Sequence, residues 1–134
     1  MIGILIVSHG DIGTSLLTSA SQILGTEQKQ VATLSVWRAD DVDDLVLRAR
    51  ELMESLDSGD GVLVLTDIFG ATPGNVVSRL LEDGRIEGVS GASLPMLLRV
   101  LTGRNGSLSA AVKRALSGGA EGVVHMNNDR CCDA

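Results

Sequence analysis

The sequence predicts an α/β fold: a three-layer α/β/α sandwich around a mostly parallel sheet of four strands, plus a C-terminal edge strand. Residues 1–7 (MIGILIV) and 62–66 (VLVLT) are nearly continuous apolar runs without alternation. Such runs are typical of strands that are buried on both faces, as in a parallel sheet covered by helices. In addition, strand-like and helix-like patterns alternate along the chain, which requires right-handed crossover connections.

The first half of the chain contains three strands and two helices. After the first strand, a helix over about residues 14–24 has one apolar face and ends at Gly25. Residues 31–36 are expected to form the second strand. Asp41 is expected to cap a long helix that runs to about residue 56, and residues 62–66 form the third strand.

The second half of the chain continues the alternation. Thr72 and Pro73 fit an N-cap followed by proline at the first helical position, which predicts a helix to about residue 81. A short strand over residues 86–89 follows. Ser93 and Ser107 are then expected to cap helices that end near residue 101 and at residues 118–119.

A last short strand is expected over residues 121–126. Because only a tail follows it, this strand is a candidate for the sheet edge or for pairing with the sheet of a neighbouring subunit. The 134 residues fit one domain, with residues 127–134 as a polar tail.

Composition excludes several function classes. The net charge of −6 argues against nucleic acid or an anionic membrane as the main partner. The chain has no apolar stretch of the roughly 18 residues that a membrane helix needs, and no signal peptide is recognisable at its start, so we expect a cytoplasmic protein.

The two cysteines, Cys131 and Cys132, are adjacent and near the C-terminus, which is consistent with a reducing compartment. Together with His125 they match no usual zinc-ligand spacing. We therefore expect neither a metal ion nor another cofactor.

Polar residues at two strand ends are the first candidates for chemistry. His9 follows the first strand and is itself followed by Gly10, and Asp67 follows the third strand. If these strands are neighbours, the two side chains face each other at the carboxyl edge of the sheet, where open α/β sheets bind ligands. A carboxylate bonded to one imidazole nitrogen leaves the other nitrogen as a nucleophile or general base.

The segment over residues 67–75 adds an expected anion site. Gly70 and Gly74 leave backbone N–H groups accessible, the next helix begins there, and the Thr72 hydroxyl is a further donor. Taken singly, these residues fit strand and helix ends without any further role. An imidazole next to a phosphate-sized site, however, predicts phosphoryl transfer through a phosphohistidine.

Three segments resemble one known family. The strand ending in Ser8-His9-Gly10, the run Thr66-Asp67-Ile68-Phe69-Gly70-Ala71-Thr72-Pro73 and the segment Gly91-Ala92-Ser93-Leu94-Pro95-Met96-Leu97 are similar to the enzyme IIA domain of the mannose family of the bacterial sugar phosphotransferase system. The resemblance covers nearly the whole chain.

The resemblance implies a transferase in sugar transport. His9 would accept a phosphoryl group from the phosphocarrier HPr and pass it to an enzyme IIB, with Asp67 orienting the histidine. Gly70, Ala71 and Thr72 would match the phosphate-binding loop, although many family members have glycine in place of Ala71. Family members form homodimers that exchange the C-terminal strand. Because no enzyme IIB domain follows, the acceptor is expected to be a separate chain.

Two other functions remain open at this stage. The same domain could be a stand-alone regulator that signals by its phosphorylation state rather than by feeding sugar uptake. A small α/β metal chelatase can also begin with a strand and a His-Gly pair. That function needs a second metal-binding residue near His9, and the only other histidine, His125, lies on the last expected strand.

Overall fold

The computed structural model describes residues 1–128. Within this range the chain forms four strands and five helices. The strands are β1 (Gly3–His9), β2 (Val31–Val36), β3 (Val62–Thr66) and β4 (Ile86–Ser90). The helices are α1 (Ile12–Leu24), α2 (Val42–Leu56), α3 (Thr72–Ser78), α4 (Leu94–Leu101) and α5 (Leu108–Glu121).

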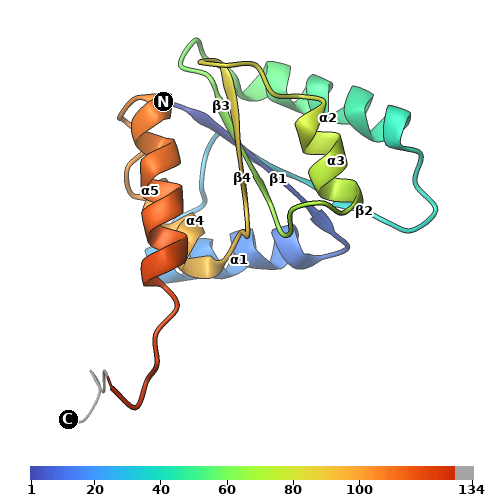
Figure 1. Cartoon of the computed structure of the whole chain (residues 1–134). Coiled ribbons are helices and arrows are strands. Elements are labelled where there is room, and N and C mark those ends of the chain that lie inside the picture. The colour runs from blue at the N-terminus through green and yellow to red at the C-terminus, as the bar shows by residue number, and fades with distance from the viewer. Residues whose placement is uncertain (129–134) are drawn as a thin grey trace.

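All four strands are parallel and lie in the order β2-β1-β3-β4. Strands β1 and β3 are therefore the central pair, and their carboxyl ends meet at the same edge of the sheet (Figure 1). This confirms the predicted four-stranded parallel sheet.

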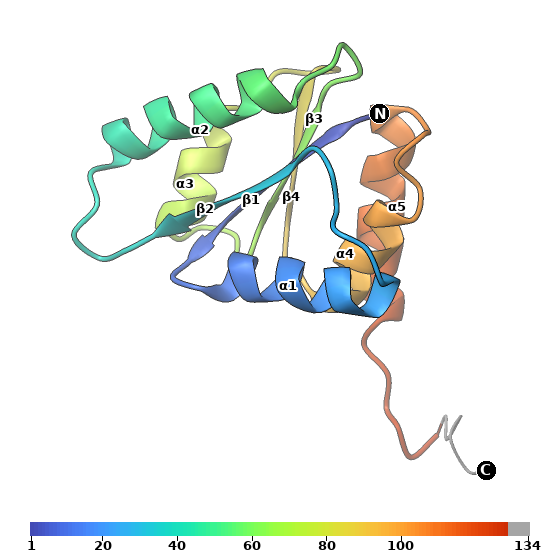
Figure 2. The same ribbon diagram turned by 180° about the vertical axis from the view of Figure 1, so that it is seen from behind.

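Helices cover both faces of the sheet. Figures 1 and 2 show α2 and α3 on one face and α1, α4 and α5 on the other. Strand β1 shows why its sequence lacks alternation: Leu5 and Val7 pack toward α2 and α3, whereas Ile4 and Ile6 pack toward the opposite helices. Each fully buried aliphatic side chain of this kind contributes roughly 1.5–3 kcal/mol.

Helices α1 and α3 begin or end differently from the sequence expectation. Helix α1 starts at Ile12 rather than at residue 14, because the buried Ser8 hydroxyl accepts the N–H of Gly13 at 2.8 Å. The predicted N-cap Thr72 is wrong by one residue. Ala71 occupies the N-cap with an extended backbone, and Thr72 is the first helical residue. This helix ends at Ser78 because the next N–H groups turn back to carbonyls three residues earlier.

The predicted strand over residues 121–126 does not form within a single chain. Helix α5 continues through Glu121, whose carboxylate lies 2.9 Å from the Arg99 guanidinium. Residues 123–128 then run away from the body of the domain (Figure 1) and pair with no strand of the described chain. The chain from residue 129, including Cys131, Cys132 and most of the predicted tail, lies outside the described residues.

Candidate functional site

The predicted pair His9 and Asp67 lies at the carboxyl edge of the two central strands. His9 is the last residue of β1, and Asp67 directly follows β3. The parallel register places Val7 opposite Thr66, so His9, two residues further along, and Asp67, one residue further along, both lie at the carboxyl edge of this strand pair. The topology therefore brings together two residues that lie 58 positions apart in the sequence.

The two side chains form a direct hydrogen bond. His9 Nδ1 lies 2.8 Å from Asp67 Oδ2, and the same carboxylate oxygen accepts the backbone N–H of His9 at 3.1 Å. An ionised carboxylate can only accept, so Nδ1 carries the proton and Nε2 has a free lone pair. The His9 side chain is 49% exposed and that of Asp67 only 10%. The imidazole is therefore accessible, and the carboxylate beneath it is nearly buried.

The second carboxylate oxygen of Asp67 is also held. Oδ1 accepts the backbone N–H of Ile68 at 3.1 Å and faces the Thr66 hydroxyl at 3.4 Å. Burial raises the pKa of the Asp67 carboxyl, but the hydrogen bonds from the side chain and backbone of His9, and the positive charge of its ring when that ring is protonated, outweigh this effect. The net result is a pKa below the ordinary value of 3.8, so the carboxylate is ionised at neutral pH.

The predicted phosphate-binding residues lie in the loop that connects this carboxylate to α3. Gly70 adopts φ +89°, a left-handed conformation that favours glycine. A Cβ added at Gly70 would meet no other heavy atom of the described chain within 4 Å. Ala71 and Thr72 follow as the N-cap and the first residue of α3. The loop is thus open on the side of Gly70, and anion binding there stays a prediction.

Three features close to His9 or to Asp67 along the chain were not predicted. The Ser8 hydroxyl is buried and holds the start of α1, so it is not available as a nucleophile. Trp37 and Phe69, the two aromatic residues, are 57% and 82% exposed. Trp37 directly follows β2, and Phe69 lies three residues after β3. Their placement after strand ends in an otherwise aliphatic chain is the feature of the sequence that could have identified them.

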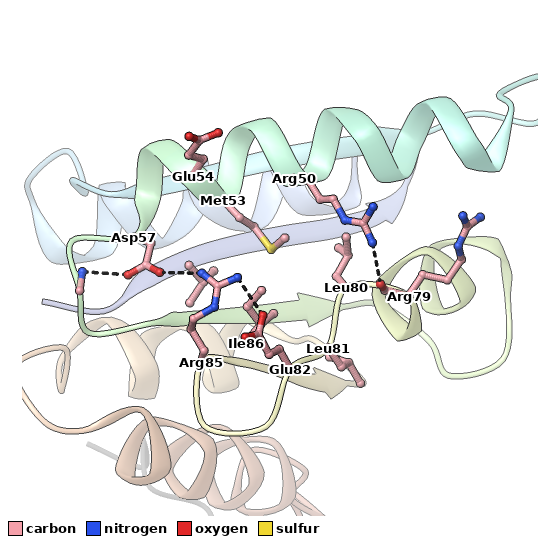
Figure 3. Close-up of a pocket in the computed structure, with 12 residues that line it drawn as sticks. Arg50, Met53, Glu54, Asp57, Arg79, Leu80, Leu81, Glu82, Arg85 and Ile86 are labelled. Atoms are coloured by element: carbon pink, nitrogen blue, oxygen red, sulfur yellow. Dashed lines mark hydrogen bonds and ion pairs between the residues drawn. The ribbon is translucent and has the colours of Figure 1, made fainter.

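A hollow with a volume of about 700 Å³ lies elsewhere, between α2 and the segment from α3 to the start of β4 (Figure 3). Several of its charged side chains already have partners. Arg85 bonds both Asp57 and Glu82, and the Arg50 guanidinium donates to the backbone carbonyl of Arg79 (Figure 3). Strands β3 and β4 reach it with their first residues, at the edge opposite His9. The hollow is therefore separate from the candidate site.

The described part of the chain contains neither a cluster of metal-ligating side chains nor a membrane-spanning helix. Over residues 1–128, no three or more His, Cys, Asp and Glu side chains gather in a way that could hold a metal ion. None of the helices in the described part of the chain has the length and apolar character needed to cross a bilayer.

Comparison with known proteins identifies relatives over most of the chain. The PTS system mannose-specific EIIAB component of Escherichia coli (strain K12) is 33% identical over 125 residues, which are 91% of this chain and 38% of that protein. The PTS system fructose-specific EIIA component of Bacillus subtilis (strain 168) is 32% identical over 103 residues, covering 76% of this chain and 70% of that protein. This chain thus spans well under half of the Escherichia coli relative.

A solved structure shows the same fold. The phosphotransferase system component EIIA from Streptococcus agalactiae superimposes with a TM-score of 0.84 at 28% identity, covering 96% of this chain and 99% of that one. The model of the EIIA-man family, described as "PTS system fructose IIA component", matches residues 3–116. The chain therefore belongs to the EIIA-man family of phosphotransferase-system IIA components.

Proposed function

We propose that this protein is a phosphoryl carrier of the sugar phosphotransferase system, which accepts a phosphoryl group from HPr on His9 and passes it to an enzyme IIB. The observation that carries the proposal is the 2.8 Å hydrogen bond between His9 Nδ1 and Asp67 Oδ2. Family membership supports the general role. The donor, the acceptor and the phosphohistidine are part of the proposal.

In this mechanism Nε2 of His9 is the nucleophile. Its lone pair forms a bond to phosphorus while the bond from phosphorus to the donor atom of HPr breaks. The imidazole gains positive charge in this step, and the ionised Asp67 carboxylate at Nδ1 stabilises that charge. Transfer to enzyme IIB is the same displacement in the opposite sense, with His9 as the leaving group.

The loop after β3 is proposed to bind the phosphoryl oxygens. Gly70 leaves its backbone open, and the N–H groups of Ala71 and Thr72 lie at the start of α3. Backbone N–H groups and the Thr72 hydroxyl are suitable donors for an anion. The methyl group of Ala71 restricts this backbone slightly compared with the glycine of many family members.

A homodimer is part of the same proposal. Strand β4 has β3 on one side, and on its other edge only its first residue, Ile86, is bridged, to Glu82, within the described chain. Residues 123–128 leave the body after α5, with Val123 85% and Met126 77% exposed. An exposed apolar segment and an open strand edge are complementary, so pairing of this segment with β4 of a second copy would satisfy both.

Reconstitution tests the proposed function. The protein is incubated with phosphoenolpyruvate carrying ³²P, enzyme I and HPr. We expect label on the protein that is labile in acid and stable in base, as a phosphohistidine is, and its transfer to an enzyme IIB. Absence of label in the complete mixture, while HPr itself is labelled, would contradict the proposal.

A further inference from the structure

Gly10, the residue after His9, has a left-handed backbone that is held by one hydrogen bond and by one aromatic contact. Gly10 adopts φ +47°, and its N–H donates to the carbonyl of Val36 at 3.0 Å. A Cβ added at Gly10 would lie 3.2 Å from Cζ3 and 3.4 Å from Cη2 of Trp37. The indole ring therefore packs directly on the turn that leaves the candidate catalytic residue.

The position of Trp37 is itself fixed. Its backbone N–H donates to the Asp40 carboxylate at 2.8 Å, and the N–H of Asp40 donates back to the Trp37 carbonyl at 3.0 Å. The side chain is nevertheless 57% exposed, and with Ile12 and Leu94 it lines a shallow hollow beside the turn. Core packing alone does not account for a tryptophan that is anchored in this way and remains half exposed.

We infer that Trp37 is a positioning residue for His9 that acts through Gly10, an inference that rests on the proposed phosphoryl transfer. The direction of the imidazole depends on the backbone on both sides of His9. The Asp67 carboxylate holds the N–H side, and the Gly10 turn holds the other side. Without the indole ring, the Gly10 turn has more freedom, and Nε2 spends less time in line with an incoming phosphoryl group.

A small-molecule phosphoryl donor distinguishes an effect on the positioning of His9 from an effect on the docking of HPr. Phosphoramidate transfers its phosphoryl group to imidazole: its P–N bond breaks, a P–N bond to Nε2 forms and ammonia leaves. We expect Trp37→Ala to lower the saturating rate with phosphoramidate about 10- to 100-fold, with little change in the half-saturating concentration. Trp37→Phe, which keeps a flat ring over Gly10, should restore most of the rate.

Leu47→Ala is the matched control, since Leu47 is a large apolar residue of α2 with a similar exposure of 59%. It should keep the wild-type rate. A second test is a double-mutant cycle. Gly10→Ala brings a Cβ against the indole ring, so its effect on the rate should be smaller in the Trp37→Ala background than in the wild type. Additive effects in this cycle would contradict a role of Trp37 through Gly10.

Amide hydrogen exchange at Gly10 tests the inference without any phosphoryl donor. We expect exchange to accelerate about tenfold in Trp37→Ala and to stay unchanged in Leu47→Ala. Wild-type exchange and an unchanged phosphoramidate rate in Trp37→Ala would overturn the inference, even if His9 is phosphorylated. If the wild type is not labelled by any donor, the proposed function fails instead, and the exchange data still decide whether Trp37 holds the turn.

Discussion

Asp67 contacts His9 through a single carboxylate oxygen, Oδ2, which lies 2.8 Å from the ring Nδ1 and 3.1 Å from the backbone nitrogen. The carboxylate therefore fixes both the ring and the backbone of the same residue. This double contact follows from the parallel pairing of β1 with β3, which brings both strand ends to one edge. In the neutral ring it selects the tautomer with its lone pair on Nε2, the atom that we propose to accept the phosphoryl group.

Replacing Asp67 should slow phosphoryl transfer far more than it affects folding. Asp67→Ala removes the acceptor that orients the ring and stabilises its positive charge, a contribution of about 10²–10⁴ in rate. Rapid-quench labelling from phosphorylated HPr measures it. The control is Asp44→Ala, which removes an exposed carboxylate in the first turn of α2. Equal rates for wild type and Asp67→Ala would disprove the orienting role.

Asp57 is predicted to stabilise the fold in a pH-dependent way. The N–H of Gly59 donates to its carboxylate at 2.8 Å and is the main reason that its pKa lies below the ordinary value of 3.8; Arg85 contributes as well. Because the pKa is lower in the folded state, this stabilisation is present above pH 3.8 and is lost as the pH falls through the folded-state value.

Asp57→Asn should therefore lower the free energy of unfolding at pH 7 by about 1–3 kcal/mol, and the difference from wild type should shrink below about pH 4. Urea unfolding across this pH range measures it. Asp83→Asn, a change at an exposed carboxylate of the turn before β4, is the control and should have little effect. A difference that stays constant with pH would argue against an ionised Asp57 as the cause.

Phe69 should contribute to partner binding rather than to stability. Its side chain is 82% exposed two residues after Asp67, so little packing is lost when it is truncated. Phe69→Ala should change the free energy of unfolding by less than about 0.5 kcal/mol. It should raise the KM for phosphorylated HPr several-fold, because exposed aromatic residues often anchor interfaces. An unchanged KM would remove Phe69 from the docking surface.

The sheet and the His9–Asp67 pair could be predicted because both depend on patterns within the sequence. The predicted bounds of the second and third strands, residues 31–36 and 62–66, are those observed. A continuous apolar run as short as residues 62–66, preceded by a glycine turn, favours a strand over a helix because most helices are longer. In a parallel sheet, residues at the carboxyl ends of neighbouring strands are close together, and the observed strand order makes β1 and β3 neighbours.

The remaining features depend on tertiary contacts that no local pattern contains. The Ser8 hydroxyl extends α1 toward its N-terminus, and the ion pair of Glu121 with Arg99 accompanies the extension of α5 beyond residue 119. The packing of Trp37 on Gly10 joins two segments through the pairing of β1 with β2. A strand was predicted where α5 ends because Val123 and Val124 have high strand propensity. These residues need a partner strand to form one, and they pair with none in the described chain.

The full chain should be a homodimer, and deletion of residues 123–134 should abolish the dimer. The deletion begins after Gly122 because α5 continues through Glu121 and its residues Ala115 and Gly118 are buried. Multi-angle light scattering measures the mass of both forms. A full-length chain that remains a monomer at high concentration would contradict strand exchange and would leave the phosphorylation of His9 untouched.

The most direct test of the central claim is to locate the phosphoryl group with two matched histidine variants. The chain has only two histidines, His9 and His125. With phosphoenolpyruvate, enzyme I and HPr, we predict that His125→Ala is labelled like the wild type. His9→Ala should take up no label while keeping its circular dichroism spectrum, since the His9 side chain is half exposed. Undiminished labelling of His9→Ala would contradict the account.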